Sequence, residues 1–160
     1  MMSVKNLEDL AGPRLQVHLQ IYVRRPDVGA IVHTHSLYAT AFSSLQRNIP
    51  VIIEEQSQVV GGEIRCTPYV PAGQHDRLGE AVAATLGQSM AALVANHGAV
   101  SCGRTLAEAL LASQVVERVA CIRILTEMVG GAIPITPESV TSERERWLYK
   151  YGKAEDKAAE

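Results

Sequence analysis

The chain has almost no net charge and no long apolar run. Its 15 Lys and Arg residues nearly balance 17 Asp and Glu residues, which gives a formal net charge of -2 at pH 7. This balance gives no reason to expect nucleic acid or an anionic membrane surface as a partner. No apolar stretch reaches membrane-spanning length without a charge, and residues 1–5 lack the core of a signal peptide. We therefore expect a cytoplasmic protein that binds neither membranes nor nucleic acids.

Disulfide, redox and nucleotide-loop motifs are also missing. The three cysteines, Cys66, Cys102 and Cys121, are widely spaced and form no C-x-x-C pair. This spacing favours free thiols in a reducing cytoplasm. None of the glycine-containing stretches has the spacing of a nucleotide-binding loop. With 160 residues, 47% of them hydrophobic, the chain can instead form one domain with a substantial core.

Apolar periodicity and turn residues predict strands and helices in alternation. Ser36 is a suitable N-cap, Thr105 to Glu108 has the form of a capping box, and Gly87 suits a helix end. Helices are predicted over residues 13–24, 36–46, 75–86, 105–129 and 137–149, and strands over 30–35, 51–55, 64–67, 92–96 and 99–102. Such interleaving indicates a layered α/β or α+β sheet domain, and it leaves the strand order open.

Three histidines stand at the ends of apolar runs. His33 and His35 close the run 29–32 as an H-x-H pair, and His97 follows the run 92–96. Alternate residues of a strand point to one face, so the pair aims both imidazoles at one site. His97 can complete a set of three nitrogens, the arrangement of a catalytic metal with an open position. For the pair alone, the alternative is two hydrogen-bonded histidines at a strand end. His18 is interpreted as a packed helix histidine, and His75 is given no chemistry.

Two segments resemble the zinc-site motifs of the class II aldolase/adducin family. They are residues 25–36 (RPDVGAIVHTHS) and 92–100 (ALVANHGAV), with Gly103, Glu108-Ala109 and Val116-Glu117 at the expected downstream positions. The resemblance covers residues 18–130 and extends to the C-terminal helix. It implies a three-layer αβα sandwich with its N-terminal strands missing, and a ring-shaped tetramer with active sites between subunits. It also implies a division into an unmatched segment (1–12), the domain (13–152) and a charged tail (153–160).

The resemblance assigns roles to individual residues. It makes His33, His35 and His97 the ligands of zinc or another divalent metal, which acts as a Lewis acid and stabilises an enediolate. Tyr151 falls where some aldolases place a proton-donating tyrosine, and a helix-end aromatic is the alternative. The implied function is a zinc-dependent aldolase-like lyase acting on a small hydroxyketone or sugar-like substrate. Because a missing sheet edge exposes apolar surface, a homo-oligomer is also expected on physical grounds.

The chain departs from the family pattern where catalysis needs a base. Arg14 stands at the position of the aldolase glutamate, and an arginine can neither ligate zinc nor accept a proton. Nothing before Pro13 resembles the family's phosphate-binding strands and loop. A carboxylate elsewhere could substitute for the glutamate, with Glu8, Asp9, Glu54 and Glu55 as the candidates. For Glu54 and Glu55, a polar loop or subunit contact is the simpler interpretation.

The missing base and the missing phosphate-binding loop have two further explanations. The chain can be a shortened gene product whose residues 1–12 are unrelated to the family. It can also be a catalytically impaired module that keeps the fold and the metal and acts through binding or assembly.

Overall fold

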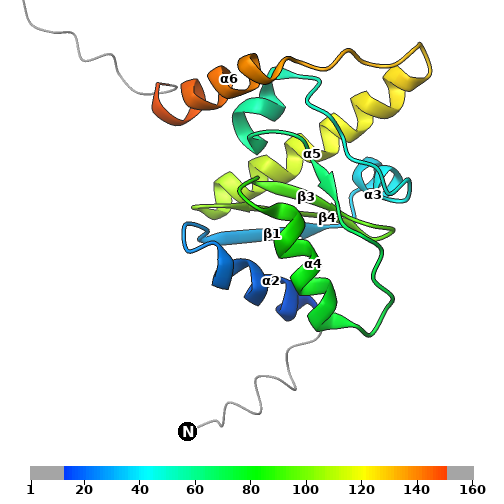
Figure 1. Cartoon of the computed structure of the whole chain (residues 1–160), viewed down its shortest axis with the longest axis vertical. Helices are drawn as coiled ribbons and strands as arrows, with labels where there is room; N and C mark the ends of the chain where they lie inside the picture. Colours follow the sequence, from blue (N-terminus) through cyan, green and yellow to red (C-terminus); the bar gives the residue numbers. More distant parts are fainter. Residues whose placement is uncertain (1–12, 151–160) are drawn as a thin grey trace, which may run out of the picture.

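The computed structural model describes residues 13–150, and a mixed sheet lies at its centre (Figure 1). Within this range the sheet has four strands: β1 (Ala30–Thr34), β2 (Arg65–Cys66), β3 (Ala91–Val94) and β4 (Gly98–Gly103). Their order across the sheet is β1-β4-β3-β2. Strand β4 runs antiparallel to both of its neighbours, and β2 runs parallel to β3. The hairpin of β3 and β4 therefore forms the middle of the sheet.

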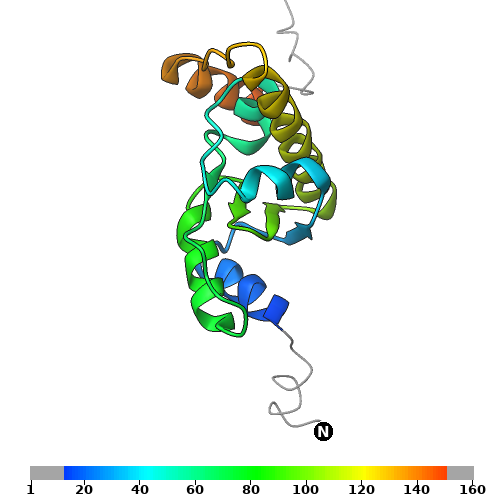
Figure 2. The same ribbon diagram turned by 90° about the vertical axis from the view of Figure 1, so that its right-hand side faces the viewer.

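Helices cover both faces of the sheet, as the three-layer prediction requires (Figures 1 and 2). Helices α2 (Pro13–Arg24) and α4 (His75–Leu86) pack together on one face. The opposite face carries α3 (Leu37–Ser43), the π-helical turn η1 (Gln56–Val60) and the long helix α5 (Leu106–Glu127). The last helix, α6 (Pro137–Tyr149), packs on η1. The αβα fold class is confirmed.

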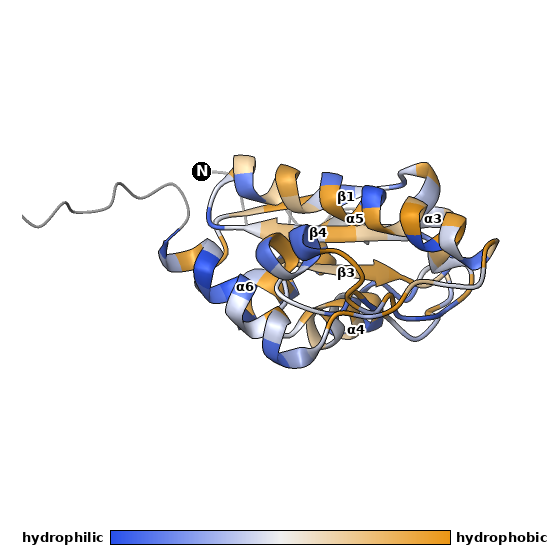
Figure 3. Cartoon of the chain, turned by 90° about the horizontal axis from the view of Figure 1, so that it is seen from above, coloured by the Kyte–Doolittle hydropathy of each residue, from blue (hydrophilic) through white to orange (hydrophobic). Residues whose placement is uncertain are grey.

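Strand β3 is apolar throughout because both of its faces are buried. Ala91 and Leu93 belong to the core beneath α5, whereas Ala92 and Val94 belong to the core beneath α2 and α4. Figure 3, seen from above, shows the apolar strands between their helices. No helix between residues 13 and 150 is long and apolar enough to cross a bilayer.

Most predicted elements are present, but the strand predicted over residues 51–55 is wrong. Ile49 and Ile64 form an isolated bridge just before it, Val51 O accepts the backbone N–H of Ile135 at 2.8 Å, and the chain then turns into η1. The buried side chain of Gln56 explains the difference. Its Oε1 accepts the backbone N–H of Ile52 at 3.2 Å, and its Nε2 donates to the carbonyls of Ile49 and Gly62. The Gln56 side chain thus replaces a strand partner at Ile52, and the backbone of Ile135 does so at Val51.

Helix ends follow the local signals closely. The predicted limits at 13–24, 75–86 and 137–149 are confirmed. The helix after Ser36 ends at Ser43, before Gln46 adopts a left-handed φ of 50°. The capping box at Thr105 is half formed: Thr105 Oγ1 accepts the backbone N–H of Glu108, but the Glu108 carboxylate accepts the N–H of Arg104 instead. The helix therefore begins as predicted, but the Glu108 carboxylate bonds to the backbone one residue before the N-cap.

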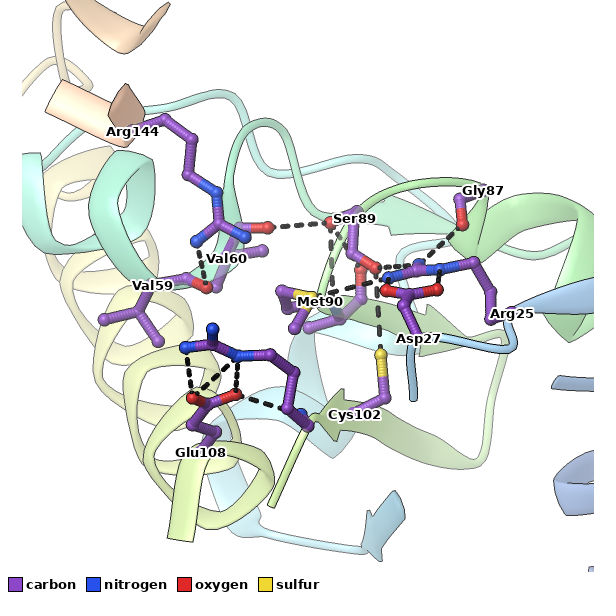
Figure 4. Close-up of polar contacts among 12 residues, drawn as sticks. Arg25, Asp27, Val59, Val60, Gly87, Ser89, Met90, Cys102, Glu108 and Arg144 are labelled. Atoms are coloured by element: carbon purple, nitrogen blue, oxygen red, sulfur yellow. Dashed lines mark hydrogen bonds and ion pairs between the residues drawn. The ribbon is translucent and has the colours of Figure 1, made fainter. Parts of the chain in front are cut away.

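The Arg25-Pro26-Asp27 turn forms a polar cluster around the buried Arg25, before β1 (Figure 4). Arg25, only 5% exposed, donates to both carboxylate oxygens of Asp27 at 2.8 and 2.7 Å. It also donates to the carbonyls of Gly87 and Ser89, in the turn between α4 and β3. Because Gly29 N–H bonds to Gly103 O, this cluster lies at the end of β1 opposite the histidines. The first part of the family motif is therefore structural.

Candidate metal centre

The three histidines converge from two adjacent strand ends. His33 lies in β1 opposite Val100 of β4, and His35 follows β1 directly. His97 lies in the three-residue turn between β3 and β4, where its backbone N–H bonds to Val94 O at 3.0 Å. The turn requires a left-handed residue, and Asn96, with a φ of 56°, supplies it. Asparagine tolerates this conformation better than most side chains do.

The imidazoles of this histidine centre lie close enough to share an ion. Ring centroids are 5.2 Å apart for His33 and His35, 4.9 Å for His33 and His97, and 4.7 Å for His35 and His97. One ligand atom of each lies within 4.8 Å of the other two. His33 and His97 are half-buried, whereas His35 is exposed. Three imidazole nitrogens with one exposed member fit a catalytic divalent metal.

No carboxylate joins this group within residues 13–150. Glu54 is exposed in the helical residues directly before η1, and Glu55 forms an ion pair with Arg118 on α5 at 3.0 Å. Arg14 is the second residue of α2. Glu8, Asp9 and Tyr151 lie outside the described residues. The structure therefore brings together the predicted nitrogen ligands, while the roles predicted for Glu54 and Tyr151 stay predictions.

A cavity of about 260 Å³ opens beside His97. Its walls come from the segment Tyr69 to His75, from Leu78, and from Ala95 and Asn96. In the sequence, the prolines and glycine of this segment indicate only turns. Their position next to the third histidine depends on the parallel pairing of β2 with β3, which no local pattern reveals. The segment is therefore the part of the site that sequence reasoning missed.

Gly98 permits the close approach of the two histidine segments. A Cβ built there would overlap the Thr34 carbonyl oxygen and lie 3.1 Å from His35 Cδ2. We predict that Gly98→Ala pushes β1 from β4, weakens zinc retention and lowers the free energy of unfolding by about 1–3 kcal/mol. Urea unfolding and zinc titration measure both effects.

Gly62→Ala is the matched control for this substitution. Gly62 has nearly the same φ (+157° against +158° for Gly98), and a Cβ there would meet no atom within 4 Å. If Gly98→Ala retained zinc as well as Gly62→Ala does, the close approach would not matter to the site.

Comparisons with known proteins agree with this architecture. The family model for the class II aldolase and adducin N-terminal domain matches residues 5–124. The L-fuculose phosphate aldolase of Haemophilus influenzae is 36% identical over 126 residues, which are 79% of this chain and 58% of that protein. The Escherichia coli K12 enzyme of the same name is 35% identical with the same coverage. This chain thus spans under two thirds of the length of these relatives.

Solved structures show the same fold. A structure of L-fuculose 1-phosphate aldolase superposes with a TM-score of 0.81 at 27% identity, covering 86% of this chain and 64% of that one. The L-fuculose-1-phosphate aldolase of Thermus thermophilus gives a TM-score of 0.65 at 26% identity, covering 79% and 67%. With the family model matching most of its length, this chain belongs to the class II aldolase and adducin family.

Proposed function

We propose that this protein is a zinc-dependent aldolase-type lyase that cleaves or forms a carbon–carbon bond in a small hydroxyketone or sugar-like substrate. The observation that carries the proposal is the meeting of His33, His35 and His97 beside an open cavity. The relatives named L-fuculose phosphate aldolases support the reaction class. A site with three protein ligands leaves room for a substrate.

The residues of the site suit this chemistry. His33, His35 and His97 would hold the ion, and as neutral imidazoles they would leave its double charge intact. A bound zinc ion would supply Lewis-acid polarisation of a carbonyl group. Asn96, Tyr69 and His75 line the cavity beside His97, where an amide, a phenol and an imidazole can orient hydroxyl groups of a substrate.

Proton transfer is assigned to residues outside the histidine group. We propose Glu54 as the proton acceptor and Tyr151 as the proton donor. The exposed position of Glu54 leaves its carboxylate open to a substrate or to a second subunit. Glu54→Gln should then lower turnover while leaving zinc content unchanged, because glutamine keeps the shape and cannot take a proton.

The test of the proposed reaction is a zinc-dependent release of aldehyde from ketose substrates. L-fuculose 1-phosphate is the first compound to assay, followed by other ketose phosphates and unphosphorylated ketoses. We expect release that a chelator abolishes and added zinc restores. Zinc-loaded protein that turns over none of these compounds would contradict the lyase.

One observation favours a second function, a metal-binding or assembly module without catalysis. No carboxylate joins the histidines within the described chain, and the family resemblance predicts Arg14, on α2, at the position of the expected glutamate. This alternative would be established by a protein that retains zinc and shows no turnover. Its zinc content should also stay the same when Glu8, Asp9, Glu54 or Glu55 is changed.

We also propose that the chain forms a homo-oligomer, such as a tetramer. Large apolar side chains remain exposed at the beginning and end of α5 and in the loop after it: Leu106, Leu110, Leu125, Met128, Val129 and Ile133. Val129 and Ile133 are 84% and 90% exposed. Apolar side chains that are this exposed at both ends of α5 are candidates for contact with another protein surface. Light scattering of the purified protein measures the number of subunits.

A further inference from the structure

We propose that Glu117 is a positioning residue of the histidine centre, because its carboxylate fixes the start of α3 and thereby the backbone at His35. Glu117 lies on α5, and both of its oxygens point to the first turn of α3. Oε1 accepts the backbone N–H of Tyr38 at 2.9 Å, and Oε2 accepts that of Ala39 at 2.8 Å. These two N–H groups have no partner inside a helix that begins at Leu37.

The local cap that the sequence suggests is absent. Ser36 occupies the N-cap position but makes no side-chain capping bond. A carboxylate from a residue 78 positions away from Ala39 performs that function instead. The adjacent Val116 is buried in the core under α5, which anchors this part of the helix. In the Val116-Glu117 motif, Val116 is therefore a core residue and Glu117 caps α3. Metal binding by the histidines alone does not explain this motif.

His35 lies in the short connection between the end of β1 and the start of α3. Thr34 is held by the β1–β4 ladder opposite Ala99, and α3 begins at Leu37. Only His35 and Ser36 connect them. His35 is also the exposed member of the histidine centre, so side-chain packing does little to orient it. Its imidazole therefore depends on the backbone at both ends, and Glu117 holds the helical end.

Charge reinforces the arrangement. Burial raises the pKa of Glu117, but the nearby Ser36 hydroxyl and the hydrogen bonds from the backbone N–H groups of Tyr38 and Ala39 lower this pKa below its ordinary value. The carboxylate is therefore ionised at neutral pH. A negative charge at the start of a helix is favourable, and two charge-assisted bonds to backbone N–H groups are stronger than neutral ones.

The experiment compares Glu117→Gln and Glu117→Ala with Glu127→Gln as the matched control. Glu127 lies on the same helix and pairs with Arg123 one turn away. Zinc affinity is measured by competition with a chromophoric chelator, well below the melting temperature of each variant. Because this inference rests on the proposed metal centre, we expect both Glu117 variants to bind zinc roughly tenfold more weakly, as when groups that orient metal ligands are removed. The control should bind zinc like the unchanged protein.

A purely structural role predicts a different outcome. Both Glu117 variants would then melt at lower temperature but bind zinc within about twofold of the unchanged protein, which is less than removal of a ligand-orienting group costs. That result would overturn the proposal. If Glu117→Ala does not fold, Glu117→Gln decides the question alone.

Amide hydrogen exchange separates this inference from the proposed function. Unchanged protein that takes up no zinc would contradict the proposed function. Exchange over residues 35–39 would then test the positioning role without metal. Faster exchange in Glu117→Gln than in Glu127→Gln supports it, and equal exchange overturns it.

Discussion

Replacing His97 with alanine should leave the protein folded but unable to retain zinc. His97 supplies one of three nitrogens that lie within 4.8 Å of one another, so its loss leaves only His33 and His35, two alternate residues of one segment. Removing groups that merely orient a ligand costs about 10–100-fold in metal affinity, so losing a ligand itself should cost more than about 100-fold. Elemental analysis after dialysis should find about one zinc per chain in the unchanged protein and almost none in the variant. His33→Ala should behave in the same way.

His18→Ala is the control for this experiment. His18 is half-buried on α2, where burial lowers the pKa of its imidazole, and it does not belong to the histidine centre. Its replacement should leave zinc content unchanged. Equal zinc content in His97→Ala, His33→Ala and His18→Ala would show that the metal assignment is wrong.

Replacing Arg25 with methionine should cause the largest loss of stability of any substitution considered for this chain. The change removes two hydrogen bonds to Asp27 and two to the carbonyls of Gly87 and Ser89, and it leaves these groups without their donor. A hydrogen bond made by a charged group contributes about 1.5–3 kcal/mol, so loss of the two bonds to the carbonyls of Gly87 and Ser89 should cost about 3 kcal/mol or more. The pair with Asp27 adds little, because the Asp27 side chain is 53% exposed. A loss of about 3 kcal/mol corresponds to a fall of roughly 6–12 °C in Tm. Thermal unfolding followed by circular dichroism measures the shift.

Arg118→Met is the matched control, because Arg118 pairs with Glu55 at the surface. Their side chains are 64% and 46% exposed, and exposed pairs of this kind contribute little. Equal Tm values for Arg25→Met and Arg118→Met would contradict the structural role of the buried cluster.

The Arg25 cluster also predicts an acid dependence. Hydrogen bonds from Arg25 lower the pKa of the Asp27 carboxyl group below its ordinary value of 3.8. Ionised Asp27 therefore contributes its stabilisation above pH 3.8, and the contribution is lost as the pH falls through the lower, folded-state pKa. The difference in stability between the unchanged protein and Arg25→Met should accordingly narrow in acid. A stability difference between the two proteins that stays constant from pH 7 down to the lowest pH at which they fold would contradict this dependence.

Elements with strong local signals could be predicted from the chain alone. Helix α4 ends at Leu86 because Gly87 follows it, and α6 begins with Pro137 after a capping Thr136. Each of these limits depends on a few neighbouring residues. The predicted strand over 51–55 failed for the opposite reason: the buried amide of Gln56 satisfies the N–H of Ile52 and the distant Ile135 satisfies the carbonyl of Val51, so these groups are not offered to a sheet.

What the sequence by itself determined is the group of three histidines proposed as ligands and the alternation of strands and helices, because strand periodicity and turn residues are local properties. Only the tertiary structure decided which groups surround those histidines. The order β1-β4-β3-β2 brings His97 to the end of β1, and parallel pairing of β2 with β3 leads the chain into the cavity beside it. Glu117 reaches the start of α3 only because α5 packs across the sheet. These contacts join residues far apart along the chain, so the packing of the hydrophobic layers selects them and no local pattern encodes them.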